Sequence, residues 1–314
     1  MVYGIFIEGL IYGIMVLGVF MTFRVLNFCD MTVDGSFPLG GCVLAACLTH
    51  GIAPGIALVI ALLSGICAGL VTTLVYTKLR VPDLLAGILV MTMLYSVNLR
   101  IMSNHANISL LKIPTIFSNI TQFVKNHSFN FSPDAAILAF LILAVLAICI
   151  CLNLFYHTDF GLAMGALGSN PQMVTSQGVN IQFMRGVGIC MGNAMAALAG
   201  ALNAMYAGFA DVGSGTGVVV SGLASLMLGE FILRTNVISL QLFRVLLGSV
   251  IYRALMYFAR RYGYVIGMNS NDLRLLTGLL IILCLIISNY DIVGFFKKHL
   301  RIRNEAELEK KCSN

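Results

Sequence analysis

The chain has no tryptophan and only six prolines, and charged residues make up just 10% of its 314 positions. An average soluble domain is about a quarter charged, so this deficit argues against a soluble fold. The sequence also lacks a G-x-x-x-x-G-K-[ST] phosphate loop, an H-E-x-x-H helix and any C-x-x-C pair. These absences argue against a P-loop ATPase, a zinc protease and a dithiol or zinc-ribbon site. We therefore expect no enzymatic activity, no metal and no cofactor in this chain.

The chain is rich in apolar residues, and 59% of its positions are hydrophobic. Runs near the ~20 residues that cross a bilayer recur along the chain, and in lipid such segments must be helical. We predict an all-α integral membrane protein with one domain over 1–314, a polytopic bundle of about eight or nine transmembrane helices. The expected spans are 2–22, 35–50, 55–77, 84–102, 133–156, 185–209, 216–233, 237–259 and 272–290.

Two polar stretches remain, an expected external loop at 103–132 and a basic tail at 295–314. Both are too short to form a core of their own. The tail contributes strongly to the formal net charge of +6, and a basic segment beside a span is attracted to anionic lipid. No basic residues alternate with aromatics on a soluble surface. We expect contact with membrane lipid and none with nucleic acid.

Glycines four residues apart occur in three of the expected spans. Such pairs make a flat stripe on a helix, which lets another backbone approach closely. The stripes predict tight packing within the bundle, and they also permit close contact with a second copy of the chain. The pairs are Gly9 and Gly13, Gly65 and Gly69, and Gly188 and Gly192.

Polar and helix-weakening residues are concentrated between the first two spans, which predicts a broken helix near 27–41. One interpretation is an ordinary cytosolic turn, with solvated acids and Arg24 paired to Asp30. The other is a gate or part of the substrate path, because discontinuous helices often build transport sites. The candidate residues are Asn27, Asp30, Thr32, Asp34 and Ser36, beside Gly35, Pro38 and the pair Gly40-Gly41.

Further polar residues lie inside the expected spans. A charge at the bilayer centre costs roughly 2.5–3.5 kcal/mol, so each should face the bundle interior or reach the interface. Glu230 and Arg234 are four apart on one helix face, and we predict that they pair. Asn98, Asn193 and Asn203 are candidates for the substrate path. The amides of Asn193 and Asn203 are equally suited to bonding across helices.

A short helix is predicted within the loop at 157–184. Asn170-Pro171 can start it, and Gly178 can end it with a left-handed residue. Its length of about two turns suits a groove on a partner protein. The alternative is a plain amphipathic surface helix.

The stretch 160–209 resembles the coupling-loop region of bacterial ATP-binding-cassette (ABC) importer permeases of the branched-chain amino-acid, ribose and nucleoside type. Gly161 and Gly178-Val179-Asn180 match the loop, and Gly192–Gly200 matches the small-residue helix behind it. Leu26-Asn27-Phe28 matches part of another family element. The stretch Asp30–Gly40 is similar to a subgroup linked to uptake of aromatic amino acids such as tryptophan and tyrosine.

This resemblance implies a permease subunit that works by alternating access. Its expected partners are a cytosolic ATPase dimer that binds ATP and magnesium, an extracytoplasmic binding protein and a second permease copy, identical or different. The expected coupling helix lies near 161–180. The family often has arginine near Leu162 and Gly165, so contact here is expected to rest on shape and backbone. The residues implied in coupling are Gly161, Gly165, Asn170, Pro171, Gly178 and Asn180.

The resemblance also fixes the expected orientation in the bacterial inner membrane, with the N-terminus outside and the C-terminus in the cytosol. Charge alone supports this weakly, because only the tail gives the inner side its excess of lysine and arginine. The favoured solute is an aromatic amino acid. Branched-chain amino acids, nucleosides and sugars remain alternatives on the same scaffold, and an ion-coupled transporter or channel is the alternative from another class.

Overall fold

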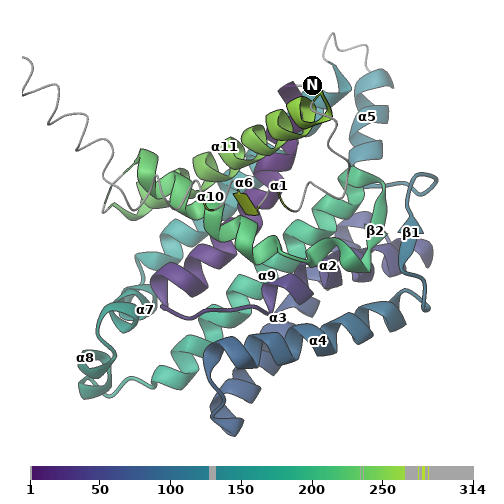
Figure 1. The fold of residues 1–314 in the computed structure, drawn as a ribbon. Coiled ribbons are helices and arrows are strands. Elements are labelled where there is room, and N and C mark those ends of the chain that lie inside the picture. The colour runs from purple at the N-terminus through teal and green to yellow at the C-terminus, as the bar shows by residue number, and fades with distance from the viewer. Residues whose placement is uncertain are drawn as a thin grey trace, which may run out of the picture.

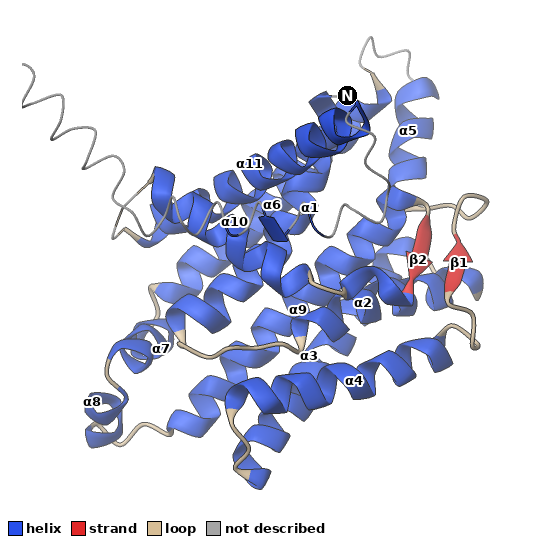
Figure 2. Ribbon diagram, in the orientation of Figure 1, coloured by secondary structure: helices blue, strands red, loops and turns tan. Residues whose placement is uncertain are grey.

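The computed structural model describes residues 2–126, 132–233, 235 and 237–265, together with residues 275, 278, 279 and 282. The described chain is a helical bundle with one small sheet at one end (Figures 1 and 2). The long helices are α1 (Val2–Val19) continued by the π-helical segment η1 (Phe20–Val25), α2 (Val33–Thr49), α3 (Pro54–Leu79), α4 (Asp83–Ile101), α6 (Pro133–Tyr156), α9 (Ile181–Ala207), α10 (Val218–Ile232) and α11 (Ile238–Val265). The predicted all-α class is confirmed.

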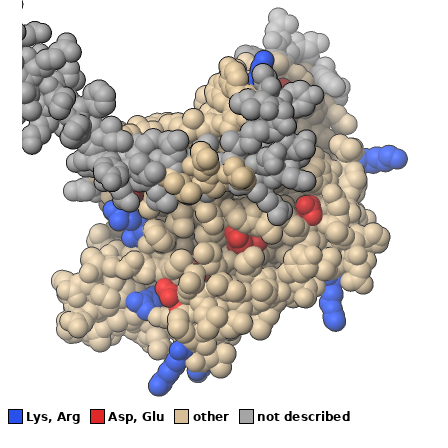
Figure 3. Space-filling view, viewed as in Figure 1, with Lys and Arg blue, Asp and Glu red and all other residues tan. Residues whose placement is uncertain are grey.

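Seven helical segments among the described residues are long and apolar enough to cross a membrane, and α2 is a shorter apolar helix. They correspond to the first eight predicted spans. The ninth, 272–290, lies almost entirely outside the described residues. The space-filling view agrees with a membrane protein, because most of the described surface on that face carries neither acidic nor basic side chains (Figure 3).

The expected external loop contains regular structure. Within 103–132 the chain forms the strand β1 (Asn107–Ser109) and the helix α5 (Ile116–Asn126). β1 pairs antiparallel with β2 (Phe209–Asp211), and Ile108 lies opposite Ala210. β2 leads into a short 3-10 helix, η2 (Val212–Gly215). The sheet thus joins two segments that are far apart in the sequence.

Helix α9 is the centre of the bundle, and small residues let its neighbours approach. An ideal Cβ on Gly65 of α3 would lie 2.5 Å from the Asn193 carbonyl oxygen. A Cβ on Gly18 of α1 would lie 2.6 Å from the Gly192 carbonyl oxygen. Such contacts leave no room for a side chain, so these glycines are needed for packing.

The glycine stripes face helices of the same chain. Gly9 and Gly13 lie against Val250 and Leu246 of α11, and Gly192 lies against α1. The suggestion that the stripes at 9–13 and 188–192 meet a second copy is therefore wrong for this arrangement. These glycines are already covered by their own chain.

Candidate functional site

The helix break is shorter than the sequence predicts. The chain leaves the helix only over 26–32, and α2 runs without interruption from Val33 through Pro38 to Thr49. Gly40 is needed for packing inside this helix, because its Cβ would lie 1.8 Å from the Ala197 carbonyl oxygen in α9. Ahead of the break, η1 is π-helical, a form that often marks functional positions. No sequence pattern had indicated this π-helical turn.

Four candidate residues of the break and of α9 meet at one buried polar network. Asp30 accepts a hydrogen bond from the Thr32 amide at 2.9 Å and another from Asn193 Nδ2 at 2.7 Å. The Ser36 hydroxyl lies within hydrogen-bond distance of the Thr32 carbonyl oxygen and of Asn193 Oδ1, and it can donate its one proton to either of them. Thr72 of α3, which the sequence did not single out, shares a 2.8 Å hydrogen bond with the Thr32 hydroxyl. All five residues are at most 5% exposed.

This network lies about halfway along α9. At 1.5 Å per residue, Asn193 is roughly 18 Å from the start of α9 in a helix about 40 Å long. The break therefore brings Asp30 to the level of the middle of α9, inside the bundle, where leaving a polar group without a hydrogen bond costs free energy of folding. Its hydrogen bonds with Thr32 and Asn193 satisfy the carboxyl group. The interpretation of this segment as a cytosolic turn with solvated acids is therefore wrong for Asp30.

Asp34 joins α2 to the start of α10. Its carboxylate accepts from the Gly217 amide at 3.0 Å and from the Val219 amide at 2.6 Å. It thereby caps a helix that has no side-chain cap of its own. The stretch 210–215 holds the end of β2 and η2, and a Cβ on Gly215 would meet the Asp34 carbonyl oxygen.

The three other asparagines are placed apart from the network. Asn98 of α4 is fully buried and donates to the Gly35 carbonyl oxygen at 3.3 Å, while its own Oδ1 has no hydrogen-bond partner among the described residues. Asn27 is exposed in the break and has a left-handed φ of 51°. Asn203 is half-buried, nearer the end of α9. Sequence reasoning grouped these residues, and the structure does not bring them together.

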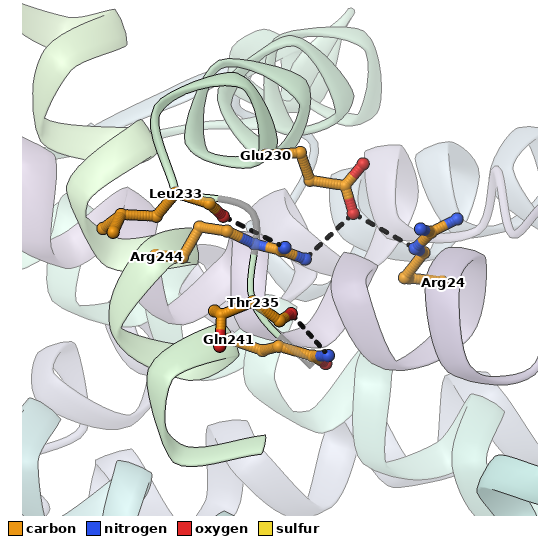
Figure 4. A network of polar contacts seen from close by, with 6 residues as sticks. All are labelled: Arg24, Glu230, Leu233, Thr235, Gln241 and Arg244. Atoms are coloured by element: carbon orange, nitrogen blue, oxygen red, sulfur yellow. Dashed lines mark hydrogen bonds and ion pairs between the residues drawn. The ribbon is translucent and has the colours of Figure 1, made fainter. Parts of the chain in front are cut away.

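A charge cluster lies where η1, α10 and α11 meet (Figure 4). One oxygen of Glu230 accepts from Arg24 Nε at 3.1 Å and from Arg244 Nη2 at 2.9 Å. The predicted Arg24–Asp30 pair is wrong, because Arg24 binds Glu230. Arg234, the predicted partner of Glu230, lies outside the described residues.

The segment between α6 and α9 forms two helices, α7 (Asp159–Ser169) and α8 (Pro171–Ser176). The Asn170 side chain caps α8 by accepting from the Met173 amide at 3.2 Å. Gly178 follows with a left-handed φ of 79°, and Asn180 caps α9 by accepting from the Gln182 amide at 3.0 Å. The predicted short helix starting at Asn170-Pro171 is confirmed, and α7 is an additional helix.

Of the two helices, α8 is exposed to solvent or to a partner, whereas α7 packs closely on neighbouring helices. Every residue of α8 is exposed except Val174. In α7, a Cβ on Gly161 would lie 2.2 Å from the Phe155 carbonyl oxygen, and one on Gly168 would lie 1.9 Å from the Val25 carbonyl oxygen. The absence of a side chain at Gly161 therefore lets α7 pack closely on the end of α6. The same absence at Gly168 lets α7 pack closely on η1. Gly165 has open space around it.

Among the residues that the structure describes, no three or more histidine, cysteine, aspartate or glutamate side chains are grouped to hold a metal ion. The arrangement combines an exposed helix, a tightly fitted connection from that helix to η1, and a buried network at mid-depth.

Comparison with known proteins identifies relatives over most of the chain. Residues 1–285 match a family model described as "branched-chain amino acid transport system / permease component". The chain is 38% identical over 286 residues to a tyrosine transport system permease protein of Clostridioides difficile strain R20291, covering 91% of this chain and 90% of the relative. It is also 30% identical over 278 residues to the uncharacterized protein RP368 of Rickettsia prowazekii strain Madrid E, covering 88% and 94% respectively. No solved structure gives a significant match.

Proposed function

The chain belongs to the branched-chain amino-acid transport permease family and is a permease subunit of an ABC importer, and we propose that its solute is an aromatic amino acid, tyrosine in the first place. The observation that carries the choice of solute is the 38% identity, over 91% of the chain, to a permease named for tyrosine transport. Branched-chain amino acids, nucleosides and sugars are alternative solutes on the same scaffold.

The chain is a multi-pass membrane protein, and the proposal places it in a bacterial inner membrane with α7 and α8 in the cytosol. Its proposed partners are an ATPase dimer that binds ATP and magnesium, an extracytoplasmic binding protein, and a second copy of this chain. The exposed α8 supports an ATPase contact. Large apolar side chains exposed on α3 and α4, such as Leu63, Leu74, Met93 and Tyr95, leave faces for lipid or for the second copy.

In the proposed mechanism, movement of the ATPases reaches α8 and then α7. Because Gly168 lets α7 fit closely on η1, a displacement of α7 must move the end of α1. We infer that Gly161, Gly165, Asn170, Pro171, Gly178 and Asn180 form this coupling segment. α9 follows directly after Asn180, so its movement is tied to the same segment.

The second half of the mechanism is a gate at the network around Asp30. Asp30, Thr32, Ser36 and Asn193 connect the break to α9, and Asp34 connects α2 to α10. We infer that alternating access rearranges these contacts. The remaining candidates for the solute path are Asn27, Asn203 and Asn98, whose buried Oδ1 has no hydrogen-bond partner among the described residues.

The test of the solute is uptake by the reconstituted complex. Proteoliposomes holding this permease, its ATPase and its binding protein should accumulate radiolabelled tyrosine only when ATP is supplied to the ATPase side. Excess phenylalanine should compete more strongly than leucine, ribose or adenosine. Tyrosine uptake without ATP would favour an ion-coupled transporter, and preferential uptake of leucine, ribose or adenosine would reject the aromatic assignment.

A change at Gly178 tests the coupling segment. Its φ of 79° is strained for any residue with a Cβ, and costs about 1–2 kcal/mol there. No atom of the described residues lies within 4 Å of a Cβ at this position, so backbone strain is the main effect of a substitution. We expect Gly178→Val to lower ATP-driven uptake at least about tenfold while the protein still inserts.

Gly178→Asn is the matched control, because asparagine tolerates the left-handed region far better than valine. We expect it to keep most of the uptake and of the ATPase stimulation. Equal activity of the valine and asparagine variants would reject a coupling role that depends on this backbone conformation.

A further inference from the structure

The end of the bundle opposite α8 carries a small cap, which consists of β1, the loop 110–115 and β2 (Figures 1 and 2). The cap is fixed to the end of α9, because the Leu110 amide donates to the Gly208 carbonyl oxygen at 2.7 Å and the Leu110 side chain is 2% exposed. Only Gly208 separates α9 from β2. Helix α9 therefore connects the cap with the segment that contains α8.

Leu111 is the exposed apolar residue of the cap. Its side chain is 82% exposed, the largest fraction among the large hydrophobic residues that the structure describes. A Cβ on Gly208 would lie 2.8 Å from Leu111 Cδ2, so the leucine covers the end of α9. Phe209 follows Gly208 and is 45% exposed. These two apolar side chains lie outside the candidate spans, because the spans that precede them end at Ile101 and Ala207.

The free edge of β1 argues against a covering of lipid. The bonds to the other strand come from alternate residues, since Leu110 donates to the residue before β2 and Ala106 accepts from the residue after it. In an antiparallel pair the residues in between direct their backbone groups away from the partner strand. Those residues, Asn107 and Ser109, are both exposed, so this edge is open. Because hydrocarbon cannot pair with backbone groups, we expect water or a protein at this edge.

The cap and the end of α4 carry positive charge. Residues 84–133 contain no aspartate or glutamate, whereas Arg100 and Lys112 are both exposed. The acid of β2, Asp211, is engaged by its own turn, because its carboxylate accepts from the Gly213 amide at 2.9 Å. An exposed leucine beside an exposed lysine is complementary to an apolar depression that is rimmed by acidic side chains.

We propose that the cap is the docking surface for a soluble binding protein, with Leu111 seated in an apolar depression of that partner and Lys112 paired with its acidic rim. The proposal rests on the proposed function for the identity of the partner and for the side of the membrane on which the cap lies. An apolar centre with charged residues at the rim is the usual plan of interfaces between separately folded proteins.

The cap is also placed to influence transport. β2 continues from α9, which carries Asn193 of the buried network. On its other side β2 leads through η2 to α10, whose first turn is capped by Asp34. A partner on the cap and the ATPases at α8 thus act on opposite ends of the same helix. The partner shifts the equilibrium between states only as far as it binds the cap of one state more tightly.

The experiment measures uptake by the complete reconstituted complex as the concentration of solute-loaded binding protein is raised. Leu111→Asp removes the apolar anchor and places a negative charge at the acidic rim, so it should raise the half-saturating concentration at least about tenfold. The half-saturating concentration for stimulation of ATP hydrolysis should rise by the same factor. Leu111→Met keeps the volume and the apolar character, so this matched control should stay within about twofold of the wild type.

Lys112→Glu tests the charge without any change at Leu111. It should raise the half-saturating concentration about fivefold at low ionic strength, and by much less at high salt, because charges at the rim of an interface are screened. Lys112→Arg keeps the charge and should behave as the wild type.

The outcomes separate this inference from the proposed function. Unchanged half-saturating concentrations in both Leu111→Asp and Lys112→Glu, with wild-type uptake that depends on the binding protein, would overturn this inference alone. Variants that respond to the content of anionic lipid, and not to the binding protein, would also overturn it. Wild-type uptake that needs no binding protein would overturn the proposed function and this inference with it.

Discussion

Replacing Gly200 with valine should remove folded permease from the membrane. A Cβ at this position would lie 1.8 Å from the Phe37 carbonyl oxygen, where real Cβ atoms essentially never come within 3.0 Å. The obstacle is the backbone of α2, which no rotamer change can move. Because Gly40 fits against Ala197 of α9 just as closely, the two helices would have to separate along their contact. We expect the free energy of unfolding to fall by about 3 kcal/mol or more, at the upper end of overpacking effects.

Thermal unfolding in detergent gives the measurement. A dye that becomes fluorescent on reacting with thiols reports exposure of the nine cysteines, and uptake is recorded in parallel. Gly55→Val is the matched control, since Gly55 lies in the first turn of α3 and no atom of the described residues would lie within 4 Å of a Cβ there. A Gly200→Val protein with the melting temperature and uptake of the wild type would contradict the packing described for α2 and α9.

The second large effect is expected at Asn193. Asn193→Asp places a second carboxyl group where Nδ2 now donates to Asp30 at 2.7 Å, between residues that are 0% and 5% exposed. Two carboxylates in such contact cannot both be ionised without strong repulsion. We expect ATP-driven tyrosine uptake to fall at least about tenfold, with a lower melting temperature.

The exchange Asp30→Asn with Asn193→Asp supplies the control. It restores one amide and one carboxylate in contact, and the carboxylate introduced on α9 can still accept from the Ser36 hydroxyl. We expect it to recover a large part of the stability. Recovery of stability without recovery of uptake would support a gating role for the charge at position 30, whereas equal damage in the single and double variants would contradict a direct pairing.

The sequence predicted the short helix α8 closely because its signals are local. Asn170, Pro171, Gly178 and Asn180 act on backbone groups within a few residues of themselves, so the ends of α8 and the start of α9 follow from their order. The same holds for the spans, whose length and hydrophobicity suffice to identify them. The break does begin near position 27 as predicted, but its extension to 41 was wrong because Gly35 and Gly40 were interpreted as helix breakers. Their lack of a side chain serves close packing against α4 and α9.

Composition and local order alone determined that this protein is a helical membrane protein with a short capped helix between two spans. Only the tertiary structure decided that Arg24 binds Glu230, that Asp30 meets Asn193 and that Asp34 caps α10. The physical reason is that lipid is as apolar as the helices it surrounds. Spans apolar on every side carry little periodic signal for which face is buried. Rotation and pairing of the helices are therefore set by the close fit of small residues and by polar groups that must find partners at depth.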